Sequence, residues 1–114
     1  MALVTFDVRA HAEGDEGGEY VLGARQTGSH ACYMIYGTLK PGERGRVIKP
    51  GAGHEEIVLA ARGNIEVTGA MTGTLRQGAA FHIAGNDVCR LENRGTSEAV
   101  YVVAGGHSGD GHSH

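Results

Sequence analysis

The chain has 114 residues, a formal net charge of −3 and 40% hydrophobic residues, which predicts one domain small enough to gain from burying a shared interface in a homodimer. No stretch is basic enough to follow a phosphate backbone, so we expect no nucleic-acid partner. There is neither a run of 18 apolar residues nor a secretory signal pattern, so we expect no membrane partner and a cytoplasmic location.

Residues 1–30 are predicted to form an N-terminal strand followed by an acidic loop. Apolar and polar side chains alternate at the start, and Val4, Phe6 and Val8 fall on one face of such a strand. Residues 11–19 then carry four acidic side chains, three glycines and no Lys or Arg. This composition is typical of a solvated loop or arm.

Short apolar runs between glycines occupy residues 31–104. The 20 glycines of the chain separate runs such as CYMIYGTL, EEIVLAA and AVYVVA, which is typical of short strands joined by tight turns. The apolar residues alternate or cluster instead of recurring at three and four, so no helix of useful length is expected. The predicted fold class is all-β, either a sandwich or a small barrel.

Residues 105–114 are predicted to form a tail rich in Gly, Ser and His. The tail contains no aliphatic side chain, so it cannot offset the entropy cost of ordering itself. Its histidines, His107, His112 and His114, are either loose ligands of a divalent metal or part of a solvating end.

Two segments, GAGHEEIVLAARG at 51–63 and GAAFHIAGNDVCRLEN at 78–93, resemble the two signature motifs of the cupin family. Glu56 and Gly63 fit the glutamate and final glycine of the first motif, and Gly78 and Asn93 fit both ends of the second without a gap. The resemblance covers residues 31–104 and implies a double-stranded β-helix, the jelly-roll cupin barrel. It also implies that the N-terminal strand pairs across a homodimer, as uncovered sheet edges favour.

The histidines of both motifs are missing from this sequence. Cys89 stands at the histidine position of the second motif. The His-x-His pair of the first falls on Pro50 and Ala52, or on Lys49 and Gly51 with the longer spacing. The resemblance therefore indicates the fold more firmly than the chemistry.

A replacement metal site is one interpretation of the remaining polar residues. Strand alternation puts His54 on the same face as Glu56, which the resemblance points into the barrel, and barrel closure would bring Cys89 towards them. An imidazole, a carboxylate and a thiolate suit Zn, Fe or Ni. In the other interpretation the barrel is metal-free, His54 is a rim residue hydrogen-bonded to Glu56, and Cys89 is a small buried hydrophobe.

Three further residues are assigned to the ligand cavity. Lys49, at a lost histidine position, could replace the positive charge of a metal and bind an anionic ligand. Either His82 or its apolar neighbours Phe81 and Ile83 enter the cavity; an external His82 is favoured, although it stays among the cavity residues. Asn93 completes this set.

Two functions follow from these features. The first is a small-molecule-binding barrel, with or without a metal, that performs no turnover. The second is a metal-dependent enzyme of dioxygenase, isomerase or decarboxylase type that acts on a small organic acid or similar metabolite. No GxSxG elbow, phosphate loop or HExxH helix is present. Cysteine catalysis by Cys89, with His54 or His82 as its base, is the third choice.

Overall fold

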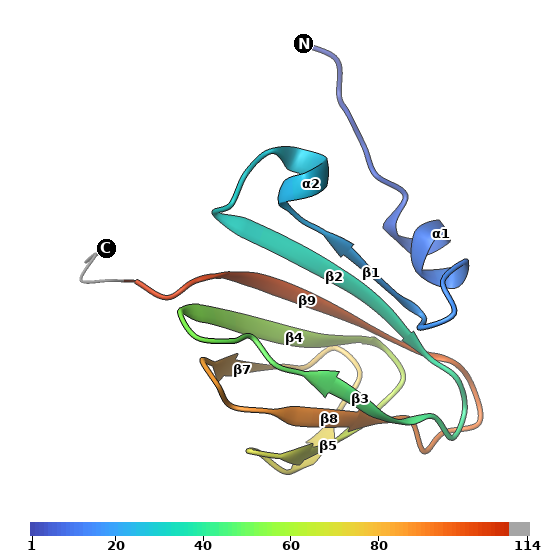
Figure 1. Ribbon diagram of the computed structural model, residues 1–114. Helices are drawn as coiled ribbons and strands as arrows, with labels where there is room; N and C mark the ends of the chain where they lie inside the picture. Colours follow the sequence, from blue (N-terminus) through green and yellow to red (C-terminus); the bar gives the residue numbers. More distant parts are fainter. Residues whose placement is uncertain (110–114) are drawn as a thin grey trace.

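The computed structural model describes residues 1–109, which fold into two packed antiparallel sheets and two short helices (Figure 1). In chain order the elements are α1 (Val8–Glu13), β1 (Glu19–Leu22), α2 (Ala24–Thr27), β2 (Cys32–Leu39), β3 (Arg44–Ile48), β4 (His54–Arg62), β5 (Ile65–Gly69), β6 (Gly73–Leu75), β7 (Ala80–Ala84), β8 (Cys89–Glu92) and β9 (Ala99–His107). The all-β class and the double-stranded β-helix predicted from the sequence are confirmed.

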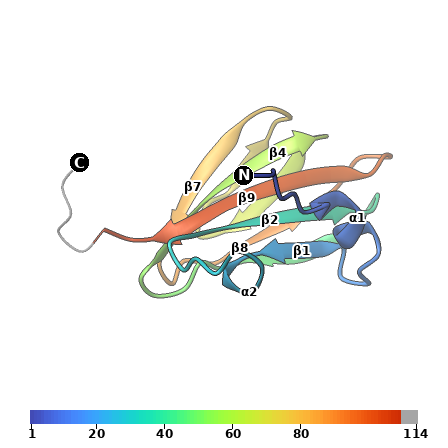
Figure 2. The same ribbon diagram turned by 90° about the horizontal axis from the view of Figure 1, so that it is seen from above.

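The larger sheet has the strand order β1-β2-β9-β4-β7, and the smaller has the order β3-β8-β5-β6. Figure 2 shows β7 at one edge of the larger sheet and β1 at the other, with both helices on the β1 side. The strands alternate buried and exposed positions, because successive side chains point to opposite faces of a sheet. Val58 and Val103 of the larger sheet and Ile65 and Leu91 of the smaller one thus form a shared apolar core.

The two ends of this sandwich are formed by different segments. One end, here called the mouth, consists of residues 48–56, 83–89 and 105–107; there the Gly51 N–H donates to Gly85 O, and the Gly85 N–H donates to His54 O. Gly51 and Gly85 have φ of 93° and 62°, so these tight turns favour glycine. The opposite end, here called the base, consists of residues 39–44 and 92–99.

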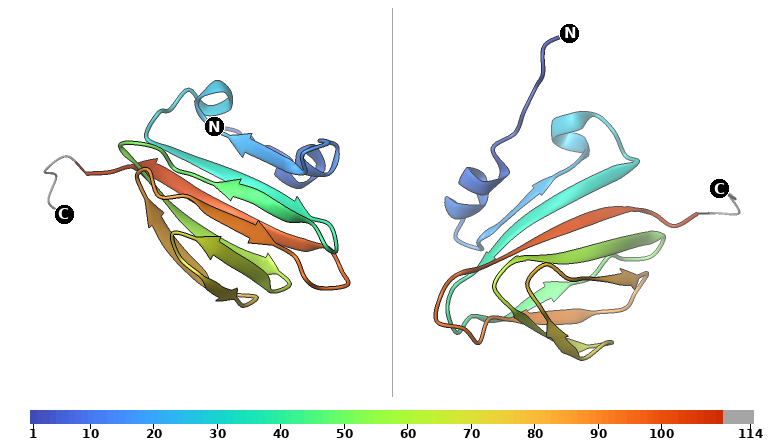
Figure 3. Two further views of the ribbon diagram at one scale, coloured as in Figure 1. Left: turned by 60° about the horizontal axis from the view of Figure 1, so that its bottom comes forward. Right: turned by 180° about the vertical axis from the view of Figure 1, so that it is seen from behind.

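The N-terminal segment differs from the prediction. Residues 1–7 form no strand in the single chain; they extend away from the sheets (Figure 3). Asp7 instead begins α1, because its carboxylate accepts a hydrogen bond from the Ala10 N–H at 3.0 Å and caps the helix. Within the single chain residues 1–7 pair with none of the sheet edges, so pairing across a dimer stays a prediction.

The boundary between the barrel and the C-terminal tail also differs from the prediction. β9 continues to His107 instead of ending before residue 105, because Gly106 pairs with Cys32 of β2 and His107 pairs with His54 of β4. His112 and His114 lie outside the described residues. Neither helix within residues 1–109 has the length and apolar character needed to cross a membrane.

Candidate ligand-binding site

Glu56 is the buried carboxylate of the mouth. On β4 the side chains of Glu56, Val58 and Ala60 are buried while Ile57 is exposed, so Glu56 points between the sheets as strand alternation predicts. Its side chain is only 5% exposed. A carboxylate in this position needs hydrogen-bond partners, because burial without them is costly.

Tyr33 provides one such partner. Its hydroxyl donates to Glu56 Oε2 at 2.5 Å. The two residues lie on β2 and β4, with Gly105 of β9 directly between them in register. A Cβ at Gly105 would lie 2.2 Å from Tyr33 Cζ, so only glycine lets the ring cross β9. Burial, together with the bond to Glu56, raises the pKa of Tyr33, which keeps the phenol a neutral donor.

Glu56 has no cationic partner among residues 1–109. The ion pairs in that range involve Glu13, Glu43, Glu55 and Glu92. Every fully buried side-chain polar atom there has a hydrogen-bond partner, and Tyr33 bonds only Oε2. The second carboxylate oxygen, Oε1, therefore keeps contact with solvent and is available to a ligand.

Two histidines lie at the same end of β4 and β9 as this carboxylate. His54 is two residues before Glu56 on the same face of β4, and it is half-buried at the rim. Its ring centroid lies 6.3 Å from that of Tyr33 and 4.7 Å from that of His107. Sequence reasoning missed Tyr33 and assigned His107 to the tail, since their places depend on the register of β2, β4 and β9.

Two of the residues assigned to the ligand cavity, His82 and Asn93, lie away from the mouth, and His82 is external as was favoured. His82 points away from the interior, where its Nε2 lies 2.7 Å from Glu55 Oε1; this bond holds the pKa of Glu55 below its ordinary value. The apolar neighbours of His82 enter the sandwich instead, because they fill its core. Asn93 is buried at the base, where its Nδ2 donates to Leu39 O at 3.0 Å and to Ser97 O at 2.8 Å. It ties loops together and takes no part in the mouth.

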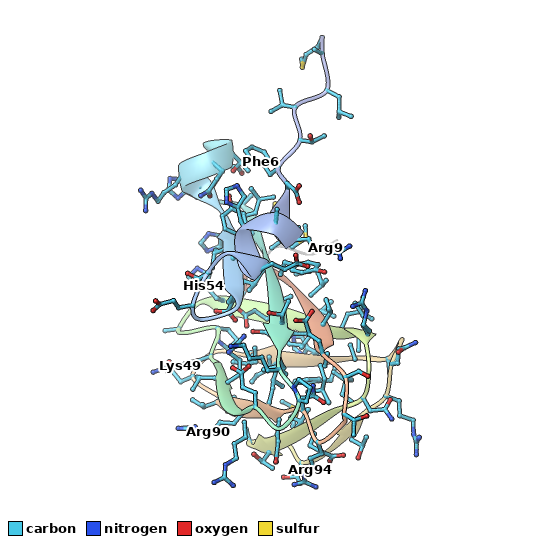
Figure 4. All side chains as sticks on the ribbon, turned by 90° about the vertical axis from the view of Figure 1, so that its right-hand side faces the viewer. Phe6, Arg9, Lys49, His54, Arg90 and Arg94 are labelled. Atoms are coloured by element: carbon cyan, nitrogen blue, oxygen red, sulfur yellow. The ribbon has the colours of Figure 1, made fainter. Side chains whose placement is uncertain are left out.

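Lys49 and Cys89 lie at the mouth in different environments. Lys49 follows β3 and is exposed; it lies on the left-hand side of Figure 4, as His54 does. Cys89 is completely buried on β8, opposite Ile48 and Gly69, and belongs to the apolar core. It packs as a small hydrophobe, which was the alternative interpretation.

A small apolar cavity opens between β5, β6 and β7. Its volume is about 140 Å³. The lining residues are Val67, Met71, Thr72, Gly73, Thr74, Leu75 and Phe81. Phe81 pairs with Val58, two residues along β4 from Glu56, and Glu56 itself does not line the cavity.

Similarity to solved structures identifies the fold. An uncharacterized conserved protein with a double-stranded β-helix domain from Klebsiella pneumoniae subsp. pneumoniae is 15% identical, with a TM-score of 0.70 and coverage of 96% of this chain and 95% of its own. An RmlC-like cupin from Shewanella frigidimarina is 12% identical, with a TM-score of 0.57 and coverage of 72% and 71%. This chain has the cupin fold.

An oxalate oxidase also shares the cupin fold. It is 22% identical with a TM-score of 0.67, and the match covers 82% of this chain but 53% of the oxidase. The chain thus spans about half the length of that enzyme. No protein-family model matches the sequence, and no curated protein is significantly similar to it. These likenesses extend to the fold and not to an activity.

The metal site of the cupin motifs does not fit the residues present. Pro50, Gly51 and Ala52 offer no ligating side chain, and Cys89 is enclosed by apolar groups. Within the described range no three His, Cys, Asp or Glu side chains come together as a metal-binding group. The predicted set of His54, Glu56 and Cys89 is therefore not assembled, because Cys89 packs into the core and Tyr33 engages Glu56.

Proposed function

We propose that this cupin-fold chain binds a small molecule at its mouth without turnover, and that Glu56 is the polar anchor of the ligand. One observation carries the proposal: Glu56 is 5% exposed and has no cationic partner among the described residues, yet one of its oxygens is free to accept a bond. A charge held in this state is costly for stability. Its retention is accounted for by a ligand that supplies the missing donor.

The geometry defines the chemistry of that ligand. The free oxygen of Glu56 accepts hydrogen bonds, so the ligand carries a hydroxyl or a positively charged amine at one end. The apolar recess between β5, β6 and β7, which Glu56 does not line, has a volume of about 140 Å³ and is smaller than a typical pocket of about 300–1,000 Å³. A ligand that reaches from Glu56 into this recess places only a few carbon atoms there. Small aliphatic amines and amino alcohols match this description.

The other hypotheses from the sequence have weaker support. An anionic ligand bound through Lys49 would need the positive charge to face the interior, but Lys49 is exposed at the rim. A metal-dependent reaction on a small organic acid would need the cupin motif ligands, which these residues do not provide. No contact in the described part of the chain favours either one over the Glu56 anchor.

A titration followed by NMR tests the proposal. Small aliphatic amines, amino alcohols and matched carboxylic acids are added separately to the full chain, and amide shifts are recorded. We expect the amines or amino alcohols to shift resonances of the mouth, and Glu56→Gln to abolish that shift. Glu55→Gln is the matched control, since Glu55 lies on the same strand with its carboxylate bonded to the exposed His82. Binding of the carboxylates alone, or binding unchanged in Glu56→Gln, would overturn the proposal.

We also propose that the protein is a homodimer in the cytoplasm, in which the N-terminal segment covers a partner. Leu3 and Val4 are 87% and 74% exposed in the single chain, and Ile57 on the outer face of β4 is 51% exposed. Exposed apolar side chains of this size mark association surfaces when they gather. Light scattering at micromolar concentration should give twice the chain mass, and Leu3→Asp with Val4→Asp should give a monomer. A monomeric parent protein would contradict the dimer.

A further inference from the structure

His54 and His107 form a cross-strand pair at the mouth. They are directly opposite each other in the antiparallel register of β4 and β9, a position in which Cβ atoms lie about 4.5–5.5 Å apart. Their ring centroids are 4.7 Å apart, and the ring planes are inclined by 37°. His54 is half-buried and His107 is exposed, so solvent reaches both rings.

One nitrogen of each imidazole ring is hydrogen-bonded to a backbone carbonyl oxygen. His54 Nδ1 lies 3.1 Å from Ala52 O, and His107 Nε2 lies 2.6 Å from His30 O. A carbonyl oxygen only accepts, so these nitrogens carry hydrogen. In the neutral rings the lone pairs are therefore on His54 Nε2 and His107 Nδ1. A histidine that ligates a metal usually donates its other N–H in this way, which fixes both its tautomer and its orientation.

We propose that His54 and His107 together bind one divalent transition metal ion through His54 Nε2 and His107 Nδ1. Imidazole nitrogen suits Cu²⁺, Ni²⁺ and Zn²⁺, with Cu²⁺ bound most tightly in the usual order of first-row metals. Two protein ligands leave the remaining positions to water or to a ligand, the arrangement of an open site. Glu56, two residues along β4 on the same face, is buried and bonds Tyr33.

This site differs from the one expected at the cupin motifs. Neither His54 nor His107 occupies a histidine position of the motifs, and His107 belongs to the last strand, which contributes to neither motif. The inference does not rest on Glu56 being the anchor of a small molecule. The two proposals are distinguishable, since one is lost with His54 or His107 and the other with Glu56.

Metal titration of the full chain tests the site directly. His112 and His114 are both changed to alanine in every sample, so that they do not contribute ligands. Cu²⁺ and Zn²⁺ are added at a pH above the ordinary imidazole value of about 6.5, and binding is measured by calorimetry. We expect one ion per chain, and we expect His54→Ala and His107→Ala each to weaken binding by about tenfold or more.

His82→Ala is the matched control, because His82 is also an exposed strand histidine but is bonded to Glu55. It should leave the titration unchanged. Circular dichroism checks that every variant is folded, and His107→Gln replaces His107→Ala if the alanine variant is not. The electron paramagnetic resonance spectrum of the Cu²⁺ form should show coupling to two imidazole nitrogens. Parent-like binding in either histidine variant, or coupling to a single nitrogen, would overturn the site.

Discussion

Two tyrosine–glutamate pairs on the inner face of the larger sheet are built alike and differ in charge. At the mouth, Tyr33 of β2 crosses Gly105 to reach Glu56. Nearer the base, Tyr101 of β9 crosses Gly37 of β2 and its hydroxyl donates to Glu19 of β1. In both rows a glycine lies directly opposite the tyrosine and a glutamate follows on the next strand.

Arg46 makes the difference between the two rows. Its Nη1 donates to the Tyr101 hydroxyl at 2.8 Å, and its Nη2 donates to Glu43 at 2.7 Å. The Arg46 side chain is 12% exposed, and burial opposes its charge, but bonds to Tyr101 and Glu43 outweigh burial and raise its pKa. The row near the base is therefore joined through the Tyr101 hydroxyl to the Arg46–Glu43 ion pair, although Glu19 itself makes no ion pair among residues 1–109. In the mouth row no cationic side chain among residues 1–109 bonds to Tyr33 or to Glu56, which is the property expected of a binding site.

Removing Arg46 should have the largest effect on stability. Arg46→Met leaves Glu43 and Tyr101 without their donor, and breaking such a partly buried network should cost about 2–3 kcal/mol of unfolding free energy, less than for a fully buried pair. Urea denaturation measures the loss. Arg90→Met, at an exposed position of β8, serves as the control. Equal stability of the two variants would contradict a structural role for the row near the base.

Replacing Gly37 or Gly105 by alanine should have the second-largest effect on stability. A Cβ at Gly37 would lie 2.1 Å from Tyr101 Cζ, and one at Gly105 would lie 2.2 Å from Tyr33 Cζ. Gly37→Ala should cost about 1–3 kcal/mol by overpacking, because Tyr101 is fully buried and cannot move aside. Gly105→Ala should cost less, since Tyr33 is half-buried and can swing out. The comparison fails if Gly105→Ala is the more damaging in urea denaturation.

Tyr33 and Tyr101 should ionise at a higher pH than an ordinary tyrosine. Burial and the bonds to Glu56 and Glu19 raise the pKa values of Tyr33 and Tyr101. When a tyrosine has a higher pKa in the folded protein than in the unfolded chain, it contributes to stability at every pH below the unfolded-state pKa of about 10. That contribution is lost as the pH rises through the folded-state pKa. In an ultraviolet titration, two tyrosines should therefore ionise only as the protein unfolds, at a pH above about 10. Replacing both residues by phenylalanine should remove this step.

The outer pair of Glu55 and His82 should have the smallest effect. Its bond lowers the pKa of Glu55, so the stability it gives is present above the unfolded carboxyl value and is lost as pH falls through the folded one. Exposed pairs contribute little. We expect His82→Ala to leave thermal stability nearly unchanged at neutral pH. In the acidic range, the variant's thermal stability should depend slightly less on pH than that of the parent protein. A large loss at neutral pH would show that His82 has a structural role.

The sequence predicts the fold better than the site because the fold follows from local patterns. Alternation along β4 grouped His54 and Glu56 on one face, the cupin resemblance pointed that face into the barrel, and the glycine spacing predicted the turns. The partners of Glu56 depend on long-range register: Tyr33 meets it only because Gly105 lies between them. Cys89 and Asn93 stand at motif positions, yet Cys89 packs into the apolar core and Asn93 lies at the base.

The paired substitutions Glu56→Gln and Glu19→Gln test the central claim most directly, through the free energy of unfolding in urea. If Glu56 is an uncompensated carboxylate held for a ligand, its neutralisation should leave stability unchanged or raise it. Glu19→Gln should lower stability, because it removes a charged acceptor from a network that contains Arg46. A loss in Glu56→Gln equal to that in Glu19→Gln would contradict the account, since both carboxylates would then be structural.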